Sequence, residues 1–127
     1  MAIIPAEKRN VAVLGASPKP ERYSNQAIRL LGRFDYRPIP VNPGFAETEG
    51  LTCYQRLAEI DQPIHTITLY VGPARSTALI DEIVAANPQR IIMNPGAENE
   101  ELAAAASGAG IEVVEGCTLV MLRTGLF

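Results

Sequence analysis

Short apolar segments recur along the chain, and segments with helical spacing separate most of them. The apolar segments have the length of strands; they are Val11–Leu14, Pro38–Val41, Ile64–Val71, Arg90–Met93 and Ile111–Val114. Strands that alternate with helices favour a parallel sheet, because each connection must cross back over the sheet before the next strand begins. The pattern therefore predicts a three-layer α/β fold, an open sheet of about five mainly parallel strands with helices on both faces.

The clearest helix follows the first predicted strand. Ala27, Leu30, Leu31 and Phe34 fall at positions i, i+3, i+4 and i+7, which places them on one apolar stripe that packs on the sheet. Ser24 or Asn25 is the expected N-cap, since both side chains accept hydrogen bonds from the free amides of a first turn.

Three further helices are expected later in the chain. The second is predicted from about Arg75 to Ala86, because Leu79, Ile80 and Ile83 share a face and Asn87-Pro88 ends the pattern. A third is expected across Glu98–Ser107, where four consecutive alanines favour helix. A short helix between Thr52 and Ile60 completes the set.

Length and composition restrict the class of protein. With 127 residues, 47% of them hydrophobic and 20% charged, the chain is expected to form a single domain over residues 1–127. No apolar stretch approaches the roughly 20 residues of a membrane helix, and no secretory leader is evident, so we expect a cytoplasmic protein without a membrane partner. The net charge of −3 argues against a nucleic-acid partner. An anionic cofactor stays compatible, because local amides and arginines can bind one.

The loop after the first strand carries the strongest sign of a ligand. An apolar strand ends at Gly15, whose missing Cβ would let a ligand approach the backbone, and Ala16, Ser17, Lys19, Arg22 and Ser24 follow before the helix. Together these residues would hold a phosphate or pyrophosphate. The single glycine does not make a G-x-G-x-x-G fingerprint, and a plain strand-to-helix connection is the alternative.

The end of the second strand argues against NAD. Dinucleotide sites usually place an acidic residue there to bind a ribose hydroxyl, whereas this chain has Val41-Asn42-Pro43-Gly44. Asn-Pro-Gly recurs at Asn94–Gly96, again directly after a predicted strand. The repeated tripeptide is explained by turn chemistry alone, by two turns that line one ligand crevice, or by both.

Catalytic residues are not apparent in the sequence. The single histidine, His65, opens the third strand at the edge remote from the predicted crevice, so neither serine nor cysteine has a base partner. No cluster has metal-ligand spacing. Cys53 and Cys117 are expected to be free thiols. The apolar run Leu119–Leu122 with Leu126-Phe127 is expected to cover the sheet or to meet another copy of the chain in a homo-oligomer.

Taken in order, a series of short motifs resembles the CoA-binding domain family, small stand-alone relatives of the N-terminal domain of the succinyl-CoA synthetase alpha subunit. The resemblance covers nearly the whole chain. The motifs are Val13–Ser17, Arg22-Tyr23-Ser24, Pro40–Pro43, Gly50 with Tyr54 and Leu57, Tyr70-Val71 with Pro73, Gly96–Glu100, and Gly110–Val114 with Cys117.

This resemblance implies a Rossmann-like fold that binds coenzyme A or an acyl-CoA along the carboxyl edge of the sheet. It implies that Gly15, Ala16, Ser17 and Arg22 meet the phosphates and that Val41, Asn42 and Pro43 line the nucleotide. Tyr70, Val71, Gly72 and Pro73 would border the adenine or ribose, and Asn94, Pro95, Gly96 and Ala97 would flank the opposite wall. Cys117 would face the same edge, where it could pair with the CoA thiol.

The chain departs from the resemblance at one charged position. The synthetase relatives have a lysine after the second strand, whereas Gly44-Phe45 stands here, so Lys19, Arg22 or Arg75 would have to neutralise phosphate instead. We also expect no counterpart of the synthetase's second domain. We therefore expect non-catalytic binding of CoA; the alternatives are an NAD(P)-binding oxidoreductase component and a ligand-free interaction scaffold of the same fold.

Overall fold

The computed structural model describes residues 4–127. In chain order the elements are η1 (Ala6–Lys8), β1 (Asn10–Leu14), α1 (Tyr23–Arg33), β2 (Arg37–Val41), β3 (Glu47–Thr48), β4 (Leu51–Thr52), η2 (Leu57–Glu59), β5 (Thr66–Leu69), α2 (Pro73–Thr77), α3 (Ile80–Ala86), β6 (Arg90–Met93), α4 (Glu100–Gly108), β7 (Glu112–Glu115) and α5 (Thr118–Thr124).

The main sheet has five strands in the order β2-β1-β5-β6-β7, and every neighbouring pair is parallel. The predicted Rossmann-like α/β architecture is confirmed. Along the chain, β2 is added on one side of β1 and the later strands on the other. The loops that leave β1 and β5 therefore turn apart at their shared carboxyl edge, which is where doubly wound sheets form a crevice.

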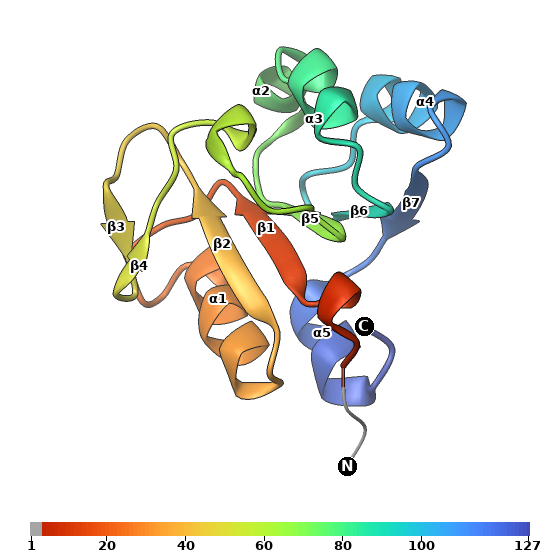
Figure 1. Cartoon of the computed structure of the whole chain (residues 1–127). Coiled ribbons are helices and arrows are strands. Elements are labelled where there is room, and N and C mark those ends of the chain that lie inside the picture. Colours follow the sequence, from red (N-terminus) through yellow and green to blue (C-terminus); the bar gives the residue numbers. More distant parts are fainter. Residues whose placement is uncertain (1–3) are drawn as a thin grey trace.

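Helices cover both faces of this sheet (Figure 1). Side chains of a strand alternate between faces, so Val11 and Val13 pack with Ile28, Leu31 and Leu122 under α1 and α5. The opposite face forms the larger apolar cluster, to which β1, β5, β6, α3 and α4 all contribute. Packing on both faces fixes the strands, and with them the loops at the carboxyl edge.

The start of α1 differs from the prediction. The helix begins at Tyr23 after Arg22, and no side chain caps it, so the expectation that Ser24 or Asn25 is the N-cap is wrong. Both residues lie inside the helix and are buried, and the Asn25 side chain donates to the Ser17 carbonyl of the preceding loop instead of capping the helix. Phe34, which was expected in the apolar stripe, follows the helix and is 43% exposed. Ile28 is buried and belongs to the stripe instead.

The helix predicted over Arg75–Ala86 is two helices, α2 and α3. Asn99 explains the interruption, because its amide donates to the Pro73 carbonyl and to the hydroxyls of Ser76 and Thr77, holding α2 as a separate turn. The same Asn99 caps α4 by accepting from the Leu102 amide, so α4 begins two residues later than predicted.

Among residues 4–127, η1, β3, β4 and α5 were not predicted. The short helix expected between Thr52 and Ile60 is the 3₁₀ helix η2, which spans three residues of that range. Before it, β3 and β4 pair in a small antiparallel hairpin that ends at Thr52. The C-terminal apolar run forms α5, which lies beside α1 and buries Leu119 and Leu122 within the chain. Among residues 4–127, no helix combines the length and the apolar character that crossing a bilayer would require.

Candidate functional site

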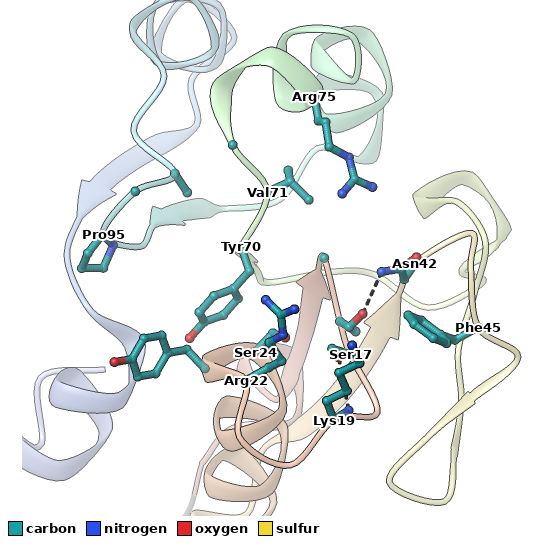
Figure 2. Close-up of a pocket in the computed structure, with 16 residues that line it drawn as sticks. Ser17, Lys19, Arg22, Ser24, Asn42, Phe45, Tyr70, Val71, Arg75 and Pro95 are labelled. Atoms are coloured by element: carbon teal, nitrogen blue, oxygen red, sulfur yellow. Dashed lines mark hydrogen bonds between the residues drawn. The ribbon is translucent and has the colours of Figure 1, made fainter.

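A cavity of about 460 Å³ opens at the carboxyl edge of the sheet, between the loops that leave β1 and β5 (Figure 2). It lies where the strand order changes direction, the position at which open α/β sheets bind ligands. The residues that line it are Gly15, Ala16, Ser17, Lys19, Arg22, Tyr23, Ser24, Asn42, Phe45, Tyr70, Val71, Gly72, Arg75, Pro95, Gly96 and Ala97.

The lining of this cavity is cationic although the chain is acidic. Lys19, Arg22 and Arg75 contribute three positive charges, and no aspartate or glutamate lines the cavity, whereas the whole chain carries a net charge of −3. Arg22 and Arg75 enter from opposite sides, one from the loop before α1 and the other from α2 (Figure 2). A concave site lined by one sign of charge concentrates ligands of the opposite sign, here anions.

The amino terminus of α1 adds free donors to the same cavity. Tyr23 and Ser24, its first two residues, line the cavity, and within residues 4–127 their amides donate to no acceptor. The first turn contains no acidic residue, so the positive end of the helix dipole is not offset there. Free amides and the dipole together favour a phosphate at this end of the helix.

Gly15 makes the sharp turn that places the loop beside this helix end. Its φ is +96°, and an added Cβ would lie 2.8 Å from Val71 Cγ1 and 3.1 Å from the Tyr70 carbonyl. The amides of Gly15 and Ala16 both donate to the Val41 carbonyl, at 3.0 and 3.2 Å. These two amides therefore hold the loop to β2, and the donors free for a ligand come from α1 instead.

Asn25 fixes the conformation of the loop from inside the molecule. Its side chain is fully buried and donates to the Ser17 carbonyl at 2.9 Å and to Glu49 Oε2 at 3.1 Å. Its Oδ1 accepts from Arg29 Nε at 2.9 Å, and Arg29 Nη2 donates to the Pro20 carbonyl at 2.8 Å. One network thus ties residues 17 and 20 of the loop to α1 and to the β3–β4 turn.

The two Asn-Pro-Gly turns are joined to their surroundings by their asparagines. Asn42 Nδ2 donates to the Ala16 carbonyl, and its Oδ1 accepts from the Gly44 amide, both at 2.8 Å. Asn94 is buried; it donates to Thr68 Oγ1 and the Leu69 carbonyl and accepts from the Thr118 amide. Asn42 links the loops after β1 and β2, while Asn94 joins β5 and β6 to α5.

A second cavity, of about 510 Å³, adjoins the first and shares Gly15, Asn42, Val71 and Arg75 with it. Apolar side chains from the ends of β1 and β2, from η2, from α2 and from the segment between α2 and α3 form most of its walls. The remaining residues that line it are Leu14, Val41, Pro43, Gln55, Arg56, Leu57, Ala74, Ala78, Leu79 and Glu82. A cationic compartment thus leads into an apolar one along one edge of the sheet.

Tyr70 borders the cationic cavity with a protonated hydroxyl. Burial raises the pKa of this phenol to about 12, against the weaker opposing effect of the Thr118 and Thr68 hydroxyls nearby. The Tyr70 hydroxyl oxygen is buried and forms no hydrogen bond with residues 4–127. Tyr70 therefore remains neutral at physiological pH.

The histidine and the two cysteines lie away from the cavities. His65 stands at the amino-terminal end of β5, where burial, together with Arg90 and Lys8, lowers its pKa. Cys53 and Cys117 are free thiols, as expected, and neither lines a cavity described above. Residues 4–127 contain no group of histidine, cysteine and acidic side chains arranged to hold a metal ion.

Comparison with known families agrees with this geometry. The family model described as "CoA binding domain" matches residues 9–123, which is nearly all of the chain. The chain belongs to the CoA binding domain family. The resemblance seen in the sequence motifs is thereby confirmed.

Individual relatives are similar over most of the chain. The uncharacterized protein YneT of Bacillus subtilis is 29% identical over 93 residues, 73% of this chain and 69% of YneT. A crystal structure of an uncharacterized protein is 38% identical, with a TM-score of 0.89 over 94% of this chain and 98% of that one.

A larger enzyme contains a similar domain. The dinucleotide-forming acetyl-coenzyme A synthetase 1 of Candidatus Korarchaeum cryptofilum, in complex with phosphate and ADP, is 25% identical with a TM-score of 0.73. The match covers 85% of this chain but only 25% of the synthetase, so the likeness concerns one part of that enzyme.

Most of the site residues that were predicted from the sequence line the two cavities. The first cavity gathers Gly15, Ala16, Ser17, Lys19, Arg22, Ser24, Asn42, Val71, Gly72, Arg75, Pro95, Gly96 and Ala97, and the second adds Val41 and Pro43. Pro73, Asn94 and Cys117 line neither. Pro73 begins α2, Asn94 is used in hydrogen bonds within the protein, and Cys117 precedes α5.

Sequence reasoning missed part of the apolar cavity. Arg56 and Leu57 come from the irregular segment around η2, and Leu79 and Glu82 from α3 and the residue before it. Leu57 was noted only as a motif residue and Leu79 only as a helix-face residue. Their convergence depends on how η2 packs against α3, for which the sequence offers no local signal.

Proposed function

We propose that this chain binds coenzyme A or an acyl-CoA, with the diphosphate in the cationic cavity and the adenosine directed into the apolar one. The observation that carries the proposal is a cavity lined by three cations and no carboxylate, at the change in strand order of a CoA binding domain family member. Lys19, Arg22 and the α1 amides would hold the diphosphate.

The apolar cavity supports a flat aromatic base at the other end of the ligand. The side chains of Val41, Pro43, Leu57, Val71, Ala78 and Leu79 all line this cavity, and together they offer apolar surface to an adenine ring. Burying such a ring is favourable, at about 25 cal/mol per Å² of apolar surface removed from water. The pantetheine arm would then leave the diphosphate on the side away from the base.

The proposed role is binding without chemistry. The cationic cavity has no histidine, cysteine or carboxylate in its lining, and Ser17 Oγ, which accepts from the Lys19 amide at 3.2 Å, has no base beside it. Nucleophilic or acid–base catalysis requires such a partner within hydrogen-bond reach. The chain would thus present or sequester the thioester rather than form it.

Calorimetric titration tests the proposal directly. We expect CoA and acetyl-CoA to bind, and NAD and FAD to bind much more weakly under matched conditions. Clear binding of NAD with none of CoA would favour the oxidoreductase alternative and contradict the proposal. Failure of all four ligands to bind would instead favour a ligand-free scaffold.

Arg22→Ala is the variant that tests the placement of the diphosphate. Loss of a charged hydrogen bond to phosphate is expected to weaken CoA binding by about 1.5–3 kcal/mol. Arg33→Ala is the matched control, because Arg33 lies in the last turn of α1 and lines neither cavity. Equal affinity in the wild type and Arg22→Ala would remove Arg22 from the site.

A further inference from the structure

We infer that Arg56 and Arg75 select ligands that carry a phosphate on the adenosine ribose, so that the site takes CoA in preference to dephospho-CoA. This inference rests on the proposed function and specifies which feature of the ligand the apolar cavity recognises. Neither arginine belongs to the phosphate loop after β1. Arg75 lines both cavities, and Arg56 lines only the apolar one.

Neither arginine uses its guanidinium to bind another part of the described chain. No hydrogen bond from either guanidinium to another residue is present among residues 4–127. Other arginines are engaged: Arg29 donates to Asn25 and Pro20, and Arg90 donates to Thr66 and lies over the Phe127 ring at 4.3 Å. Arg56 and Arg75 therefore retain their donors for a ligand.

The order of the two cavities places the ribose near these arginines. With the diphosphate at the α1 amides and the base between apolar walls, the ribose that connects them must pass the residues shared by both cavities. Arg75 is one of these shared residues, together with Gly15, Asn42 and Val71. Figure 2 shows Arg75 above Asn42 and next to Val71. A phosphate on this ribose would meet Arg75 at the junction and Arg56 on the wall beyond it.

The turn after β2 provides no positive charge for a ribose phosphate, so other residues must supply it. This turn, Asn42–Phe45, carries no charge, and Phe45 contributes an aromatic wall to the cationic cavity instead. A phosphate taken from water into this cleft needs a positive partner to offset its desolvation. Among the residues that line the apolar cavity, Arg56 and Arg75 are the ones with positive charge.

Glu82 lines the same cavity and favours the alternative ligand, a ribose without a phosphate. It is the carboxylate among the lining residues, and its Oε1 accepts from the Ala58 amide at 3.3 Å. A carboxylate suits a ribose with free hydroxyls and repels a ribose phosphate. Two arginines against one glutamate leave a positive balance, which favours the phosphorylated ribose.

Parallel titrations with CoA and dephospho-CoA test the inference, because the two ligands differ only in the ribose phosphate. We expect dephospho-CoA to bind wild-type protein about tenfold or more weakly, the loss typical of a charged hydrogen bond. In Arg56→Gln, CoA affinity should fall toward that of dephospho-CoA, while dephospho-CoA affinity stays unchanged. Arg33→Gln removes the same charge far from both cavities and should leave the preference intact.

Each result has a separate meaning. Equal binding of CoA and dephospho-CoA by the wild type would overturn the inference and leave the proposed function standing. An equal loss for both ligands in Arg56→Gln would also overturn it, because Arg56 would then contact a part that they share. Failure of both ligands to bind the wild type would refute the proposed function itself. Arg56 is exposed, so a thermal unfolding curve suffices to show that its variant is folded.

Discussion

At the scale of single residues, Gly15 joins the fold to the site. It follows β1 with a positive φ, and an added Cβ would lie 2.8 Å from Val71 Cγ1 and 3.1 Å from the Tyr70 carbonyl. Gly15→Ala is expected to destabilise the protein by about 2–4 kcal/mol, from left-handed strain together with overpacking. Urea unfolding measures this change.

The matched control is Gly32→Ala, in which the added methyl meets no atom within 4 Å inside α1. Because alanine favours helix over glycine, this variant should be more stable by about 0.5–1 kcal/mol. A similar loss in both variants would show that close approach at Gly15 is not the cause.

The raised pKa of Tyr70 predicts that the protein loses stability at alkaline pH. The phenol ionises near pH 10.0 in the unfolded chain and near 12 in the folded one, so its contribution is complete below pH 10.0 and is lost as the pH rises through 12. Tyr70→Phe cannot ionise and should lose less stability between pH 9 and pH 11 in urea unfolding. It also removes a buried hydroxyl without a partner, so stability at neutral pH should not fall. The same alkaline loss in both proteins would contradict this account.

At the scale of elements, the Asn25 network connects α1, the phosphate loop and the β3–β4 hairpin. Asn25→Ala removes hydrogen bonds to Ser17, Glu49 and Arg29 at a fully buried position. We expect a loss of about 2–3 kcal/mol in the free energy of unfolding, because buried polar groups are left without partners. Gln26→Ala, the neighbouring control, breaks one exposed hydrogen bond to Glu21 and should cost less than about 1 kcal/mol. Equal effects would show that the network does not hold the loop.

The sequence predicted the elements whose own residues determine them. The five strands of the main sheet follow from apolar runs, and α1 from its apolar stripe. The sequence failed where contacts with other segments decide the outcome. Asn99, the N-cap of α4, holds α2 apart from α3, and Asn25 lies within α1, where it binds the Ser17 carbonyl instead of capping the helix. The β3–β4 hairpin is closed by Glu49 and Gly50 at positive φ, a turn that their residue types only weakly indicate.

At the scale of the whole molecule, the site follows from topology more than from any motif. Once β5 adds to β1 opposite β2, the loops at Gly15, Asn42, Val71 and Gly96 must share one edge, which the strand alternation already implied. Arg56 and Glu82 could not be found this way, because their convergence depends on the packing of η2 against α3.

Mapping amide chemical shifts during a CoA titration tests the central claim most directly. We predict the largest changes at the free amides of Tyr23 and Ser24 and around Gly72 and Gly96, all at the carboxyl edge of the sheet. Residues near His65, at the opposite edge, should not shift. Shifts concentrated at that opposite edge, or none at saturating CoA, would contradict the account.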